Sequence, residues 1–289
     1  MKTINNLKSI SKEIWDNRVR LLRLSIYDLK SMNSGTFFGY FWHFLLPAIN
    51  LGVYFLAFGV GLKQNDSTYP FPFVIWLMTG LMPWLFISSS ITQGAGAIGQ
   101  YSGIVKRMPF PLSIVPIKPI ITNYFVHVCS MLIVLLVYAF TEGLSVYAFQ
   151  LIYYNICSLA LLVALSFLFS TLSVISKDFK KILSPVIRLF FFVSPIFWNY
   201  ETRGGIFSAY LPIVRSINPF SYIIEGYRYS LVDYTHIDKI TGDFIAEYSY
   251  SPFWTHWDRA LIFWATVLIV FVIGINIHAN LRKKFVDLI

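Results

Sequence analysis

Long apolar stretches without a charged residue constrain the fold of this chain more than any other feature. Five of them contain no Lys, Arg, Asp or Glu. Each is close to or above the ~20 residues that a helix needs to cross a ~30 Å hydrocarbon core, a length that buried helices of soluble domains rarely reach without a charge. The sequence therefore predicts an integral membrane protein with one transmembrane domain over residues 1–289. The five stretches are Phe37–Leu62, Phe73–Ile91, Pro119–Phe140, Leu151–Ser176 and Leu261–Asn280.

The distribution of charge predicts the topology. Charged residues make up only 13% of the chain, against ~25% in typical soluble domains. Basic residues concentrate before the first stretch, at 93–117, around residue 178 and after the last stretch. With a sixth, shorter segment at Ile182–Trp198, the positive-inside rule predicts an all-α protein with six transmembrane helices and cytoplasmic termini. The net charge of +9 lies beside the spans, which points to membrane lipid and not to nucleic acid as a partner.

Two segments outside the spans also have apolar patterns. In residues 1–36, apolar residues recur every three to five positions among basic ones, which predicts an amphipathic helix in the membrane surface. The alternative is a cytosolic helix packed on the bundle. The outer segment, 199–258, contains the apolar pieces Ile206–Val214 and Phe220–Val232, each too short to span. We expect a re-entrant helical hairpin followed by a small cap, with a surface lid as the alternative.

The sequence lacks the motifs that catalysis would need. It contains no G-x-x-x-x-G-K-[ST] phosphate loop, no H-E-x-x-H and no G-x-S-x-G, and its five histidines are scattered, so neither enzyme activity nor a metal site is expected. The spans offer no acidic relay for a proton or sodium gradient. If the chain is a transporter, the energy must then come from elsewhere. A membrane enzyme acting on lipid-linked sugars and a passive channel are the alternatives from other classes.

Five short motifs, in order along nearly the whole chain, carry a family resemblance. Together they resemble the permease subunits of ABC-type polysaccharide exporters. The sequences of the first three motifs are most similar to those of teichoic-acid translocation permeases. The motifs are Gly39-Tyr-Phe-Trp42 with Pro47, Gly80-Leu-Met-Pro83-Trp84-Leu-Phe86, Val105-Lys-Arg-Met-Pro-Phe-Pro111, Ser194-Pro-Ile-Phe-Trp198, and Asn218-Pro-Phe220 through Glu225-Gly-Tyr-Arg228.

The resemblance implies a function and a set of partners. Permeases of this family pair with a second copy of themselves and with two ATP-binding subunits, so that ATP and Mg would bind the partner chains and this chain would carry no cofactor. The resemblance also implies a lipid-linked anionic polymer as substrate and the bacterial cytoplasmic membrane as location. We therefore expect export of undecaprenyl-linked wall teichoic acid, with export of O-antigen or capsular polysaccharide as the alternative.

In the same resemblance, the cytoplasmic loop at 93–117 serves as a coupling element seated on the ATP-binding subunit. Lys106 and Arg107 can pair with acidic residues of such a partner. Four nearby prolines would stiffen the connection to the next span. The alternative is that the two basic residues only anchor the loop at the membrane. The coupling candidates are Gln100, Tyr101, Val105, Lys106, Arg107, Pro109 and Phe110.

A path for a sugar polymer needs surfaces along which the polymer can slide, and aromatic rings provide them by stacking on apolar sugar faces. Aromatic residues make up 18% of the chain, although most of them belong to interfacial belts or lipid-facing packing. Arg188 could contact an anionic substrate or extend toward the inner headgroups. The path candidates are Phe38, Trp42, Trp84, Arg188, Phe191 and Trp198.

The expected outer hairpin contains two charged residues one helical turn apart. Glu225 and Arg228 could pair with each other or gate the outer exit, and the structural role is the better interpretation. Asn218 and Pro219 mark the break between the two short helices.

Overall fold

The computed structural model describes residues 2–32, 34–60, 73–101, 103, 110–141, 143–198, 210–232, 234–237, 244–248, 251–282 and 285. Within these ranges, five helical segments are long and apolar enough to cross a membrane. Each overlaps one of the five charge-free stretches, so the helical membrane fold is confirmed. The segments are Gly39–Val60, Phe73–Gln100, Leu112–Thr141, Val146–Ile175 and Phe253–Leu281.

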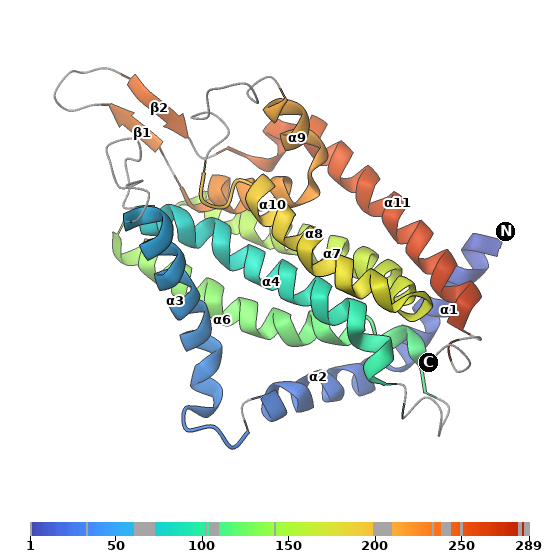
Figure 1. Ribbon diagram of the computed structural model, residues 1–289. Helices are drawn as coiled ribbons and strands as arrows, with labels where there is room; N and C mark the ends of the chain where they lie inside the picture. Colours follow the sequence, from blue (N-terminus) through green and yellow to red (C-terminus); the bar gives the residue numbers. More distant parts are fainter. Residues whose placement is uncertain are drawn as a thin grey trace.

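The bundle is built around α4 (Phe73–Gln100), which packs against α6 (Lys118–Thr141) and α7 (Gln150–Ile175). Helix α11 (Trp257–Leu281) lies along the other side of α7 (Figure 1). In the most apolar window of α4, 78% of the residues are buried, against 11% in the segment of α3 (Trp42–Tyr54) and its π-helical continuation η2 (Phe55–Val60). The first span is therefore a peripheral helix with most of its surface uncovered.

Helix α8 (Lys177–Val193) occupies the place of the predicted sixth span. It begins directly after Ser176 and runs back beside α4 and α7 (Figure 1). Its 17 residues correspond to about 25 Å, less than the ~30 Å core. Of its residues, only Leu183 and Phe191 are buried. The sixth crossing therefore stays a prediction.

The N-terminal segment forms two helices, where the sequence predicted one. Helices α1 (Lys2–Asp16) and α2 (Arg18–Met32) meet at Asn17. One side of α1 packs on the bundle, with Ile10 only 1% exposed beside Phe167 and Ile275. This packing agrees with the alternative of a helix docked on the bundle.

The other side of the same two helices remains apolar and uncovered. Trp15 is 67% exposed, and Val19, Leu22 and Ile26 follow it on α2 with about half of their surfaces exposed. An exposed apolar face between basic residues is typical of a helix in the membrane surface. The structure therefore combines both expectations, with one face on the bundle and one face free for lipid.

The opposite end of the bundle contains the outer segment. Two short helices, α9 (Leu211–Ile217) and α10 (Pro219–Leu231), are followed by strands β1 (Tyr234–Ile237) and β2 (Phe244–Tyr248). The strands pair antiparallel, with Tyr234 opposite Tyr248, an element that the all-α expectation did not include. Short 3₁₀ turns complete the architecture: η1 (Gly39–Phe41), η3 (Leu112–Ile114), η4 (Val146–Phe149) and η5 (Phe253–His256). Helix α1 and the C-terminal end of α11 lie at the end of the bundle away from these strands (Figure 1).

Candidate translocation pocket and outer hairpin

An aromatic pocket between α3, α4 and α8 brings together three of the six path candidates. Trp84, Arg188 and Phe191 all line a cavity of about 340 Å³. The rings of Trp84 and Phe191 lie 5.9 Å apart, and Tyr54 of α3 lies 5.2 Å from Phe191. Arg188 is exposed on α8. The pocket thus places one cation among aromatic rings, a surface that suits a polymer of sugar rings with acidic groups.

The other path candidates lie elsewhere. Trp198 is buried beyond the end of α8, where its Nε1 donates to the carbonyl oxygen of Phe192 at 3.1 Å. Because Phe192 lines the aromatic pocket, Trp198 contacts the pocket wall without lining the pocket itself. Phe38 and Trp42 pack edge to face at 5.5 Å near the start of α3, and neither lines the aromatic pocket. Trp42 lines a second cavity between α3, α4 and α6, and the role of both residues in a path stays a prediction.

The break between α9 and α10 is set by Asn218 and Pro219. The Asn218 side chain accepts a hydrogen bond from the Phe220 amide at 3.0 Å. This is a standard N-cap, and Pro219 at the first helical position has no amide hydrogen to leave unsatisfied. The Asn218 Nδ2 also donates to the Ser194 hydroxyl at 3.0 Å, which ties the hairpin to the segment after α8. Helix α10 then runs buried from Phe220 to Leu231, so it is not a lid on the surface.

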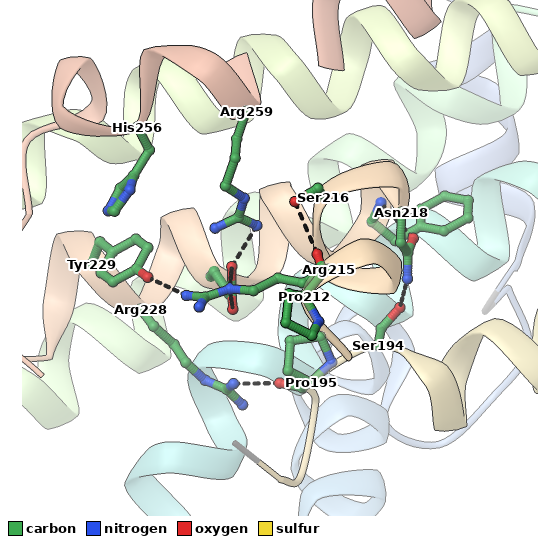
Figure 2. A network of polar contacts seen from close by, with 12 residues as sticks. Ser194, Pro195, Pro212, Arg215, Ser216, Asn218, Arg228, Tyr229, His256 and Arg259 are labelled. Carbon is green, nitrogen blue, oxygen red and sulfur yellow. Dashed lines mark hydrogen bonds and ion pairs between the residues drawn. The ribbon is translucent and has the colours of Figure 1, made fainter. Parts of the chain in front are cut away.

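Glu225 is the centre of a buried charge cluster at this end of the molecule. Its side chain is 1% exposed and pairs with Arg215 of α9 at 2.9 Å and with Arg259 of α11 at 2.5 Å. Figure 2 shows both arginines converging over α10, with Arg215 also donating to the Tyr229 hydroxyl at 2.8 Å. One carboxylate therefore joins three helices, and this helps explain why a charge is tolerated inside the bundle.

Arg228 has a different set of partners. Its guanidinium donates to the carbonyl oxygens of Pro195 and Ile196 (Figure 2) and lies 3.6 Å from the centre of the Trp76 ring. The space for it exists because Gly80 has no side chain, since a Cβ there would lie 2.8 Å from the Arg228 Nη2. Arg228 thereby fixes the chain that leaves α8.

The expected pairing of Glu225 with Arg228 was therefore wrong. Although the two residues are one turn apart, the buried carboxylate meets arginines from α9 and α11. Sequence reasoning missed Arg215 and Arg259 as partners. The available signal was that Arg215 is a basic residue in a segment predicted to lie outside, where the positive-inside rule disfavours it, and that Arg259 directly follows this segment.

At the other end, the predicted coupling loop begins inside a helix. Gln100 is the last residue of α4, and Tyr101 follows it with its ring 5.4 Å from Phe110. Helix α4 includes the glycine-rich stretch. At Gly94, the absence of a side chain lets Ser166 of α7 approach closely, since a Cβ on residue 94 would lie 2.6 Å from the Ser166 Oγ. Val105, Lys106, Arg107 and Pro109 lie outside the described residues.

Two ion pairs attach the N-terminal helices at this end. Asp28 of α2 pairs with Lys118 at the start of α6, and the Lys118 ammonium lies 4.9 Å from the centre of the Tyr101 ring. Glu13 of α1 pairs with Arg282 at 2.9 Å and accepts a hydrogen bond from Ser113 at 2.8 Å. The N-terminal helices are therefore joined to Ser113 and Lys118, at the C-terminal side of the predicted coupling loop, and Lys118 in turn contacts Tyr101.

Several membrane-length helices, with a charged hairpin buried at one end of the bundle, define a multi-pass membrane protein. Residues 21–232 match the sequence profile of the family described as ABC-2 type transporter. The chain belongs to this family, and the resemblance to polysaccharide export permeases is confirmed.

Three relatives cover much of the chain. It is 29% identical over 220 residues to the O-antigen export system permease protein RfbA of Myxococcus xanthus, covering 75% of this chain and 82% of that protein. It is 24% identical over 266 residues to the O-antigen export system permease protein RfbA of Klebsiella pneumoniae, covering 91% of this chain and 92% of that protein. It is 22% identical over 189 residues to the polysialic acid transport protein KpsM of Escherichia coli, covering 65% of this chain and 71% of that protein.

Proposed function

We propose that this chain is the membrane-embedded permease of an ATP-driven exporter that moves lipid-linked polysaccharide out of the cytoplasm. The observation that carries the proposal is the nearly end-to-end alignment with an O-antigen export permease, over 91% of this chain and 92% of the relative. The relatives are named for O-antigen and polysialic acid. They favour the O-antigen or capsular alternative over the teichoic-acid expectation, and we adopt that alternative.

The proposal includes partners that complete the machine. ATP-binding subunits would bind at the end of the bundle that contains the 93–117 loop, and they would hold the nucleotide. A second copy would pack on η2 and α8, because Leu56 of η2 is 63% exposed and Leu189 of α8 is 60% exposed. Arg188 lies on the same uncovered helix, where lipid contact alone would be costly for a charge. Two copies would enclose the two aromatic pockets in one path, with both chain termini in the cytoplasm of a bacterial cell.

Reconstitution tests this function directly. The chain would be co-purified with its ATP-binding subunits and placed in vesicles that hold undecaprenyl-linked O-antigen-type glycan, acidic capsular glycan or glycerol-phosphate polymer. We expect ATP-dependent movement of a glycan across the bilayer and none without ATP. Movement of the glycerol-phosphate polymer alone would instead support export of teichoic acid. Movement without nucleotide or partner subunits would overturn the proposal.

Arg188→Gln tests the role of the aromatic pocket. Since Arg188 is exposed in the single chain, its contact with an acidic polymer has the strength of a solvated ion pair, and we expect the initial export rate of acidic glycan to fall about two- to fivefold. Export of a neutral glycan should change less. Lys181→Gln, which removes an exposed cation from the start of the same helix, is the matched control. Equal rates for Arg188→Gln and the unaltered protein would leave contact with inner headgroups as the role of Arg188.

A further inference from the structure

A second cavity, lined mainly by uncharged side chains, lies between α3, α4 and α6. Its volume is about 210 Å³, and it is separate from the aromatic pocket because the two share no lining residue. Polar side chains from three membrane-length helices face it at helical spacing. The residues that carry the argument are Trp42 and Asn50 of α3, Ser89 and Gln93 of α4, and Asn123 and His127 of α6.

Several hydrogen-bonding groups of Gln93, Asn123 and His127 in this cavity have no partner among the described residues. Asn123 Nδ2 donates to Gln93 Oε1 at 3.2 Å, which leaves Asn123 Oδ1 and the Gln93 amide hydrogens without partners in the described part of the chain. His127 is 2% exposed and contacts the Tyr227 hydroxyl through Nε2 at 3.0 Å, whereas its Nδ1 has no partner among the described residues. Unsatisfied polar groups at membrane depth are costly and mark binding sites or pathways.

The chemistry of the lining selects a ligand class. Amides and a hydroxyl group present both donors and acceptors, as a ring carrying several hydroxyl groups requires. Trp42 adds an aromatic ring that can stack on an apolar sugar face. The amide groups carry no charge. This cavity therefore differs from the aromatic pocket, where Arg188 could pair with acidic groups. A phosphate would find no Lys or Arg among the lining residues.

We infer that this cavity binds a neutral sugar ring of the lipid-linked substrate, the ring nearest the lipid carrier, before the polymer enters the aromatic pocket. Met32, at the end of α2, lies at its rim, so the cavity lies toward the end of the bundle at which α2 crosses it. A carrier lipid in that leaflet could place its first sugar here. The inference rests on the proposed function, because it takes a lipid-linked glycan as the substrate.

The test uses two probes that differ only in the sugar. Undecaprenyl pyrophosphate carrying one N-acetylhexosamine, and the same carrier without sugar, are titrated onto the complex of the chain with its ATP-binding subunits in lipid nanodiscs. The variant is Gln93→Leu with Asn123→Leu, which replaces both partners of one hydrogen bond by apolar side chains of broadly similar size. Asn276→Leu is the matched control, since this amide on α11 donates to the Val272 carbonyl oxygen and lies outside the cavity.

We expect the unaltered complex to bind the sugar-bearing probe at least tenfold more tightly than the bare carrier. The double variant should lose this preference while its affinity for the bare carrier is unchanged, and Asn276→Leu should keep the preference. A double variant that still prefers the sugar-bearing probe, or an unaltered complex that binds both probes equally, would overturn the inference while leaving the proposed function standing. An unaltered complex that binds neither probe and exports no glycan would instead overturn the proposed function.

Discussion

Glu225→Ala is expected to destabilise the bundle more than the removal of any exposed charge. The substitution leaves Arg215 and Arg259 without their shared carboxylate at a position where the Glu225 side chain is 1% exposed and the Arg259 side chain is 9% exposed. Removing one partner of a buried ion pair typically costs about 3–5 kcal/mol, because the remaining charge stays buried. The loss should be visible as a large fall in the midpoint of thermal denaturation of the purified protein, followed by tryptophan fluorescence.

Two comparisons separate this effect from a general response to charge removal. Asp178→Ala breaks the exposed ion pair with Lys181 on α8, and we expect no measurable change because exposed pairs contribute little. Glu225→Gln with Arg259→Met removes the carboxylate charge together with one of its cations, and it should recover part of the lost stability. An unchanged midpoint for Glu225→Ala would show that the three-helix charge cluster does not hold the outer hairpin in place.

Gly226→Ala should be nearly as damaging, although it adds a single methyl group. A Cβ at this position of α10 would lie 2.0 Å from Cε1 of Tyr154 on α7. Tyr154 is 2% exposed and has little room to move. Forcing extra volume into a well-packed interior typically costs about 1–3 kcal/mol, and here the close approach of two helices is lost as well. The expected result is a low yield of monodisperse protein on size-exclusion chromatography and a lowered denaturation midpoint.

Gly99→Ala provides the control for the glycine substitution. Gly99 also lies in a helix, but nothing lies within 4 Å of the position that an added Cβ would take. Alanine is the better helix former by about 1 kcal/mol, so this variant should be as stable as the unaltered protein or slightly more so. If Gly226→Ala behaved like Gly99→Ala, then α10 would not pack as closely on α7 as the structure shows.

The spans could be predicted from sequence because their signal is local. A run of about twenty apolar residues has one stable solution in a bilayer, a helix, whatever its neighbours are. Helix boundaries were less accessible. The sequence around Gly94 and Gly96 resembles a loop, yet α4 continues to Gln100. Those glycines admit Ser166 and Lys180 from other helices, and that contact depends on tertiary packing.

The candidate site was predicted in part for a similar reason. Arg188 stood out as a charge within an apolar segment, and its helix brings Phe191 and Trp84 to the same pocket. The partners of Glu225 were missed, because Arg215 and Arg259 lie 10 and 34 positions away in the sequence and meet it only once α9 and α11 are placed. Spacing along one helix cannot predict which buried charges will pair across three.

The attachment of the first helix to the last one has a consequence for how the protein is made. Asn6 donates to Asn276 at 3.0 Å, and Glu13 pairs with Arg282, so the docking surface of α1 is completed by residues translated after all the intervening helices. During synthesis, α1 must wait without its final partners while every intervening helix is inserted. A ribosome stalled before residue 276 would therefore leave an open assembly intermediate, and the bundle would close only after the residues around 276–282 have been made.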